Sequence, residues 1–156
     1  MWQDARTSDY HVRSSQASPP GYEWSTSVQV DSISFGDQGP PSVVTGPSDL
    51  MFAAWTGRDG SIRAAYVAHS TDNGASWGPS RVISGDLDSP KDAAIALGGG
   101  QLTAVFSAVA SGYRSVYAVT SNNWGASWSS PFLIASGESA RVGIPSVAID
   151  ADMVAV

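Results

Sequence analysis

Few side chains in this sequence have the type and spacing that chemistry needs. His11 and His69 have no Asp, Glu or Cys at the spacing of a metal site, and both fall in expected strands. Ser76 and Ser127 lack a histidine partner, which argues against a nucleophilic serine. Three aspartates lie close together in the sequence: Asp86, Asp88 and Asp92. They lack the glycine and glutamate of a dedicated calcium loop, so we expect a solvated acidic edge, no metal and no cofactor.

The most suggestive segment reads Trp55-Thr56-Gly57-Arg58-Asp59-Gly60. It places a guanidinium beside a carboxylate, but Asp-Gly is also an ordinary turn pair. Two interpretations therefore stay open, a solvated turn and a binding loop. Three aromatic residues are candidate platforms for a sugar ring: Trp55, Tyr113 and Trp124. Trp55 is equally well interpreted as a core residue.

These side chains must be positioned by turns and strands that recur along the chain. Residues 70–77 read Ser-Thr-Asp-Asn-Gly-Ala-Ser-Trp, and residues 121–128 read Ser-Asn-Asn-Trp-Gly-Ala-Ser-Trp. A third copy, residues 17–24, keeps only the glycine and the tryptophan. The Asp-Asn-Gly core predicts a tight turn, and the tryptophan offers a large ring to bury beside the next strand. The copies recur about every 50 residues, close to the length of one propeller blade.

The octamers resemble the Asp-box, Ser-x-Asp-x-Gly-x-x-Trp, of the sialidase-like (BNR-repeat) six-bladed β-propellers. The first copy matches at every fixed position: Ser70, Asp72, Gly74 and Trp77. The second replaces the aspartate: Ser121, Asn123, Gly125 and Trp128. The third retains Gly21 and Trp24. In that family the box is a structural turn between the third and fourth strands of a blade, so we interpret these residues as fold markers.

The resemblance also implies a site on the opposite face of a propeller. Sialidases carry a Gly-Arg pair after the second strand, followed by an aspartate on a loop. By this resemblance Arg58 would bind a substrate carboxylate as a two-pronged donor, and Asp59 would be a general acid. The family also uses a tyrosine nucleophile with a glutamate partner. The weak candidates here are Tyr113, with its neighbour Arg114, and Glu138.

The sequence departs from the family at the arginines that precede the first strand of a blade. The corresponding Arg-Ile-Pro triplets read Gly39-Pro40-Pro41 and Gly143-Ile144-Pro145, so a glycine replaces the arginine in both. Arg141 lies two residues before the second triplet and is out of register. These departures argue against catalysis.

Short apolar runs between Gly, Pro, Ser and Asp clusters predict an all-β fold. The expected strands are Tyr10–Ser14, Thr26–Val30, Ser42–Thr45, Leu50–Trp55, Arg63–His69, Arg81–Ile83, Ala93–Leu97, Leu102–Ser107, Ser115–Thr120, Phe132–Ile134, Ser146–Ile149 and Met153–Val156. Residues 3–30 would form strands three and four of one blade, residues 42–83 and 92–134 two complete blades, and residues 145–156 strands one and two of another. The whole chain, 1–156, is one half-propeller domain in this interpretation.

The two half-blades are complementary. Closing them within one chain gives three blades, below the usual ~4–8. Exchange between two chains gives a six-bladed homodimer, which covers the open strand edges. A fragment of a longer chain is the alternative.

Composition narrows the function. The chain has 156 residues, a net charge of −6, no cysteine and 42% hydrophobic residues. The sequence has no cluster of basic residues that could bind a phosphate backbone, so nucleic acid is not an expected partner. No apolar run approaches the ~18 residues of a membrane span, so a membrane is not expected either. The start of the chain lacks the apolar core of a signal peptide, although the resemblance favours a secreted or extracytoplasmic protein.

The sequence therefore predicts a non-catalytic sialidase-like propeller module, assembled from two chains, with an axial face that binds carbohydrate. The alternatives are a piece of a sialidase-type glycoside hydrolase and a scaffold without ligand, natural or engineered.

Overall fold

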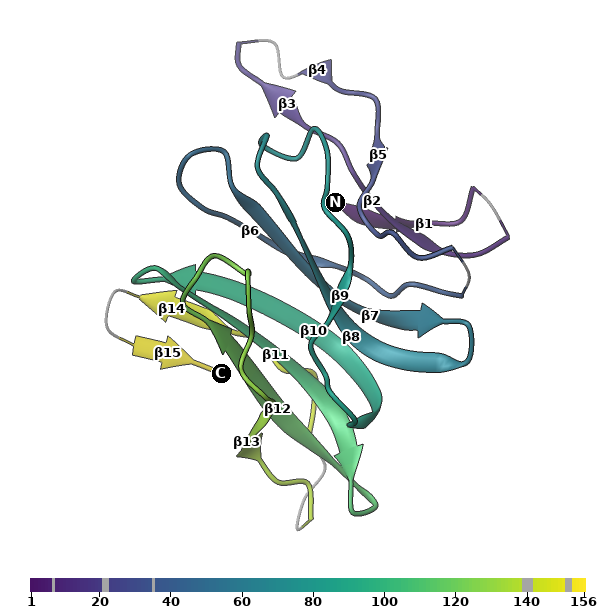
Figure 1. Cartoon of the computed structure of the whole chain (residues 1–156), viewed down its shortest axis with the longest axis vertical. Coiled ribbons are helices and arrows are strands. Elements are labelled where there is room, and N and C mark those ends of the chain that lie inside the picture. Colours follow the sequence, from purple (N-terminus) through teal and green to yellow (C-terminus); the bar gives the residue numbers. More distant parts are fainter. Residues whose placement is uncertain (7, 21–22, 35, 139–141, 151–152) are drawn as a thin grey trace.

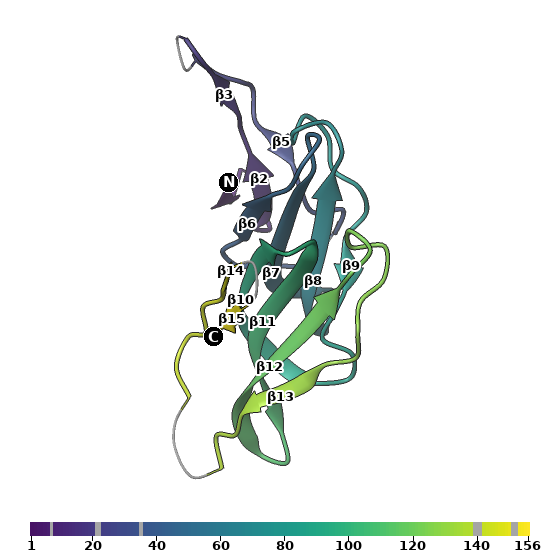
Figure 2. The same ribbon diagram turned by 90° about the vertical axis from the view of Figure 1, so that its left-hand side faces the viewer.

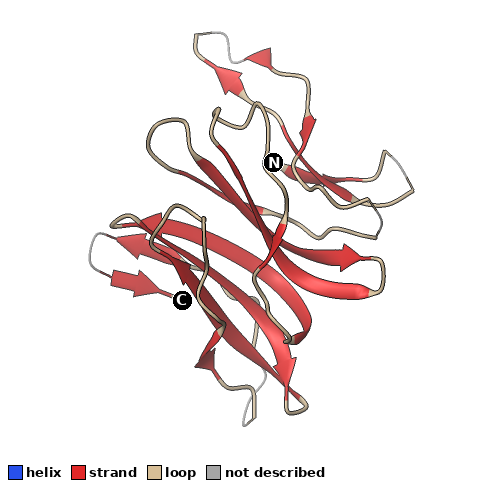
Figure 3. Ribbon diagram, in the orientation of Figure 1, coloured by secondary structure: helices blue, strands red, loops and turns tan. Residues whose placement is uncertain are grey.

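The computed structural model describes residues 1–6, 8–20, 23–34, 36–138, 142–150 and 153–156. Every regular element in these ranges is a strand (Figures 1 and 3), so the all-β prediction is confirmed. No helix in the described ranges is long and apolar enough to cross a membrane.

Two complete four-stranded sheets form the centre of the chain. Each is an antiparallel meander whose strands follow the chain order. The first comprises β6 (Ser42–Thr45), β7 (Met51–Asp59), β8 (Ile62–Ser70) and β9 (Arg81–Val82). The second comprises β10 (Asp88–Gly98), β11 (Gln101–Ala110), β12 (Tyr113–Ser121) and β13 (Phe132–Ala135). We refer to these two sheets as the first and the second blade; they span residues 42–82 and 88–135, close to the ranges 42–83 and 92–134 expected from the sequence.

Three strands form a smaller sheet at the N-terminal end, in the order β1–β2–β5. Their bounds are β1 (Trp2–Asp4), β2 (His11–Ser14) and β5 (Val28–Gln29). Two further hairpins complete the chain: β3 (Ala17–Ser18) with β4 (Glu23–Trp24), and β14 (Ala148–Asp150) with β15 (Met153–Ala155). Strand β1 has no counterpart among the predicted strands, because three residues are too few for an alternating pattern to be recognised.

Two segments that fall between the expected strands belong in part to strands. Arg58 and Asp59 belong to β7, which continues to a two-residue turn at Gly60 and Ser61. Gly60 has φ +59°, the left-handed conformation that glycine adopts without a steric penalty. The second segment, 84–91, contains the start of β10, which pairs with β11 through two irregularities in register. Its Ser-Pro-Lys-Asp composition is typical of a loop, and pairing with the long neighbouring strand overrides that local preference.

The three repeats have the same cross-strand register. The third strand pairs with the fourth at the same spacing in each: Arg13 with Gln29, Tyr66 with Val82, and Tyr117 with Leu133. The second strand pairs with the third in the same way: Trp2 with Arg13, Trp55 with Tyr66, and Phe106 with Tyr117. Strand β1 is therefore the equivalent of β7 and β11.

The sheets pack face to face in sequence order (Figures 1 and 2). Strand β7 shows why, because its alternate side chains serve two separate cores. Ala53 and Trp55 pack against Val12 and Val30 of the N-terminal sheet region. On the other face Phe52 and Ala54 pack with a group from the second blade: Ile95, Leu102, Phe106 and Tyr117.

The turns at residues 70–77 and 121–128 share one hydrogen-bonding scheme. The Ser70 hydroxyl donates to Asp72 Oδ1 (2.7 Å) and accepts the Gly74 amide (2.7 Å). Asp72 accepts the Ser76 amide (2.8 Å) and the Ser76 hydroxyl (2.5 Å). These bonds, the Ser76 hydroxyl first, hold the pKa of Asp72 at about 2.

Asn123 reproduces this scheme without a charge. Its Oδ1 accepts the Ser121 hydroxyl (2.9 Å) and the Ser127 amide (2.9 Å), while its Nδ2 donates to Ser127 Oγ (2.8 Å). Trp77 and Trp128, which were expected to be buried, are half-buried, and each packs against a core cluster.

The pair of boxes predicts a difference in pH dependence. The depressed pKa of Asp72 adds stability above its ordinary value of 3.8, and this contribution is lost as the pH falls through about 2. Asp72→Asn should therefore flatten the decline of the melting temperature between about pH 4 and 2. Asn123→Asp should steepen it. Thermal melts of the three proteins across this range provide the measurement, and parallel curves would contradict the assignment.

Candidate functional site

A cleft of about 590 Å³ opens where the first and second blades meet the segment 37–41. Its wall combines the last part of β7, the first part of β8 and the first half of β10 with Ile144 and Pro145. Segments far apart in the sequence therefore meet here, and both glycine-containing triplets, 39–41 and 143–145, contribute to it.

Three cationic side chains line the cleft: Arg58, Arg63 and Lys91. Arg58 and Arg63 are direct partners across the β7–β8 hairpin, an arrangement that like charges disfavour. The ion pairs found among the described residues, Arg6–Asp4 and His11–Asp31, involve none of the three. Asp37 and Asp92 are the acidic residues on the wall. An anion between the arginines would relieve their repulsion.

Gln38 holds the segment 37–41 against β7. Its side chain is fully buried and donates from Nε2 to the carbonyls of Gly36 (2.9 Å) and Arg58 (2.6 Å). Its Oε1 accepts the indole N–H of Trp55 at 3.0 Å. Gly57 has no side chain here because a Cβ would collide with the Gln38 amide. The backbone of Arg58 is thereby fixed at the cleft, and its amide donates to the Asp37 carbonyl (3.0 Å).

Backbone contact also explains the first departure from the Arg-Ile-Pro triplet. The Gly39 amide donates to the Thr56 carbonyl (2.7 Å), and a Cβ at position 39 would lie 2.7 Å from that same oxygen. No side chain fits there without a backbone shift. At Gly143 a Cβ would meet nothing within 4 Å, so that position has room for a side chain.

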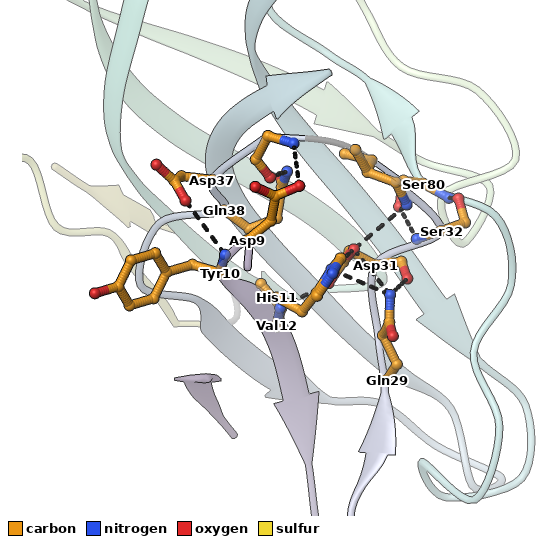
Figure 4. Close-up of polar contacts among 12 residues, drawn as sticks. Asp9, Tyr10, His11, Val12, Gln29, Asp31, Ser32, Asp37, Gln38 and Ser80 are labelled. Carbon is orange, nitrogen blue, oxygen red and sulfur yellow. Dashed lines mark hydrogen bonds and ion pairs between the residues drawn. The ribbon is translucent and has the colours of Figure 1, made fainter. Parts of the chain in front are cut away.

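Figure 4 shows polar contacts that tie β2 to the segments 29–32 and 37–38. The buried Asp31 carboxylate contacts His11 Nδ1 (3.0 Å) and accepts the Val12 amide (2.6 Å). The Tyr10 amide donates to Asp37 Oδ1 at 3.2 Å. His11 thus has an acidic partner that sequence spacing does not reveal, since Asp31 lies 20 residues away. The contact joins β2 to the segment that follows β5, which is a structural role.

The structure separates the other site candidates. Asp59 is exposed beside the hairpin turn and does not line the cleft. Tyr113 is exposed at the start of β12, and Arg114 donates to the Ser89 carbonyl (3.0 Å) and to Ser107 Oγ (3.1 Å). Glu138 is exposed in the loop after β13. Arg141 and Gly21 lie outside the described residues.

The aromatic candidates differ in burial, and the acidic side chains do not form a metal-binding cluster among the described residues. Trp55 is completely buried, so its interpretation as a sugar platform is wrong. Trp124 and Tyr113 are exposed but do not line the cleft. Among the described residues no three His, Cys, Asp or Glu side chains gather as they would around a metal ion.

Sequence reasoning did not identify Arg63, Lys91 or Gln38. Arg63 could have been predicted from the sequence, because a two-residue turn at Gly60 and Ser61 places it opposite Arg58. Lys91 and Gln38 reach the cleft through packing between sheets and have no local signal.

Comparison of the sequence with models of known families and with curated proteins finds no match. Among solved structures, the chain is similar in fold to the Hadza microbial sialidase Hz136, with a TM-score of 0.53 and 19% sequence identity. The likeness covers 60% of this chain and 25% of that one. The chain therefore has a sialidase-like β fold of the propeller type and spans a quarter of the protein that it resembles.

The structure predicts that Gln38 stabilises both the fold and the cleft. Gln38→Ala leaves the buried Trp55 N–H without its acceptor, which should lower the free energy of unfolding by about 1–3 kcal/mol. The control is Gln101→Ala, because the Gln101 amide bonds Asn122 at the surface, and it should change stability by about 0.5 kcal/mol or less. Urea unfolding measures both, and equal effects would show that the Gln38 contacts contribute no more than a surface contact.

Proposed function

We propose that this chain is a non-catalytic binding module whose cleft holds a sugar with a carboxylate group. The observation that supports this most directly is the convergence of Arg58, Arg63 and Lys91 in one cleft, with two of them directly opposed. Guanidinium groups bind carboxylates through paired N–H donors, so an acidic sugar offers both the charge and the geometry that the cleft lacks.

The remainder of the wall suits a sugar ring. Thr56 and Gln3 supply a hydroxyl and an amide beside the cations, and Pro40, Pro41 and Ile144 supply apolar surface. Sugar sites in proteins combine such flat apolar contacts with a few placed polar groups.

The arrangement also supports a binding function over a catalytic one. Neither Asp59, Tyr113 nor Glu138 lines the cleft. Asp37, one of its two acids, already accepts the Tyr10 amide. The remaining acid, Asp92, is exposed on the irregular part of β10.

A sialidase-type hydrolase is the second candidate, and it is favoured by the fold likeness to Hz136. In that case the reacting groups would come from sheets that complete the ring, since the chain covers only 25% of that sialidase. The two candidates differ in whether bound sugar is turned over.

The binding proposal predicts that Arg58→Ala weakens affinity for N-acetylneuraminic acid about tenfold or more, because a charged hydrogen-bond donor is lost. Arg81→Ala is the matched control, since Arg81 is an exposed cation whose guanidinium donates to the Ala126 carbonyl outside the cleft. Calorimetric titration should show weaker binding of the methyl ester than of the free acid. Equal binding of acid and ester, or equal losses in the two variants, would contradict the proposal.

The non-catalytic proposal predicts that a fluorogenic sialoside is not hydrolysed between pH 5 and pH 7.5. The assay follows release of the fluorophore at high protein concentration. Hydrolysis that Arg58→Ala abolishes and Arg81→Ala preserves would establish the hydrolase candidate instead.

A further inference from the structure

The box tryptophans reveal a rule of packing between repeats. Each lies against the sheet that precedes its own. Trp77 packs on the N-terminal sheet region and donates its indole N–H to Ser14 Oγ of β2 (3.0 Å). Trp128 packs on the core cluster between the two blades, and it lines one small cavity together with Phe52 and Val67 of the first blade.

Trp24 occupies the same position in the first repeat, but it packs on neither core cluster of the described residues. It is 74% exposed, on the β3–β4 hairpin at the N-terminal end of the molecule (Figure 1). A large aromatic side chain so exposed commonly marks an interaction surface. The rule predicts that its partner is the far face of a blade.

The second blade has a vacant face of this kind. A groove of about 370 Å³ lies over β11 and β12, with Thr103 and Ala118 among its lining residues. Its walls are four half-exposed side chains. Phe132 and Ile134 belong to β13, Val154 belongs to β15, and Val156 follows β15. The Thr103 hydroxyl is buried and has no hydrogen-bond partner in the structure.

This groove is the repeat equivalent of the place where Trp128 sits. On the first blade the Trp128 ring is bordered by Val67 and Arg81, which are cross-strand partners. On the second blade the partners in the same register are Ala118 and Phe132, and both line the groove. The smaller Ala118 leaves more space for an incoming ring.

The strands beside the groove also match the register of the complete blades. Val154 pairs with Ile149 next to the β14–β15 turn, as Leu102 pairs with Leu97 next to the β10–β11 turn. Ile149 lies against Gly98 as Leu97 lies against Gly46. Strand β15 thus corresponds to the first half of β11, whereas β1 corresponds to its second half, because Trp2 matches Phe106.

We propose that a second copy of this chain occupies the groove. The second copy's β1–β2–β5 sheet would continue the sheet that β14 and β15 begin, and Trp24 of that copy would fill the groove. The unpaired Thr103 hydroxyl offers an acceptor for the indole N–H. Two copies related by a two-fold axis would form this contact twice and give six sheets, within the usual ~4–8 blades.

One polar residue must be accommodated at this interface. Arg13 stands where the complete blades have Tyr66 and Tyr117. Its guanidinium donates to the carbonyl of Ser27 (3.0 Å) and to Ser27 Oγ (3.1 Å), and its strand partner is Trp2. These contacts pair its donors within its own sheet, and an arginine beside an indole ring is a favourable combination.

Sedimentation velocity over a range of concentrations tests the proposal on the full chain. The unaltered protein should sediment as a dimer. Trp24→Ala and Phe132→Asp should each weaken the dimer tenfold or more while circular dichroism still shows a folded sheet protein. The controls are Trp124→Ala and Leu133→Asp, exposed side chains that do not line the groove, and these should remain dimeric.

A second readout does not depend on altered stability. The sequence has no cysteine, so Phe132→Cys and Leu133→Cys each introduce one thiol. The thiol at position 132 should react slowly in the dimer and faster on dilution, whereas the thiol at position 133 should react fast throughout. A monomer at all concentrations, open-ended oligomers, or a dimer that Trp24→Ala leaves unchanged would overturn the proposal. Equal protection of the two thiols would do so as well.

Discussion

The structure depends on one constraint, which is that the sheet β6–β9 is apolar on both faces. Ala53 and Trp55 require a cover on one side, and Phe52 and Ala54 require one on the other. A sheet of this kind cannot exist alone in water, because either face left open would expose a continuous apolar surface. The N-terminal sheet and the second blade supply the two covers, so stability is distributed between two interfaces and belongs to no single sheet.

The arrangement of strands follows from the sequence wherever the alternation is long. Strand β6 lies at the residues predicted for it. The turns at residues 70–77 and 121–128 also lie where the sequence predicts, because Gly74 and Gly125 mark positions with positive φ. Strand β1 and the first residues of β10 could not be predicted from local pattern. Both form because a neighbouring strand offers hydrogen bonds, which is information that lies elsewhere in the chain.

The cleft was predictable in part. The Gly57-Arg58 pair identifies the correct hairpin, but Asp59 at the same hairpin does not line the cleft. Gln38 could not be recognised, since its importance comes from a carbonyl 20 residues away and an indole 17 residues away. Trp55 was ambiguous for the same reason: only the packing of the sheets decides whether an aromatic residue on a strand is core or surface.

The contact between Gly39 and the Thr56 carbonyl has an evolutionary consequence. Because this backbone segment lies so close to its neighbour, one codon change at position 39 cannot introduce an arginine without a shift of the backbone. The route to such a residue would require the segment to move first, and that movement would disturb the Gln38 contacts that hold it. Position 143 carries no such barrier, so new side chains are more accessible to selection there than at position 39.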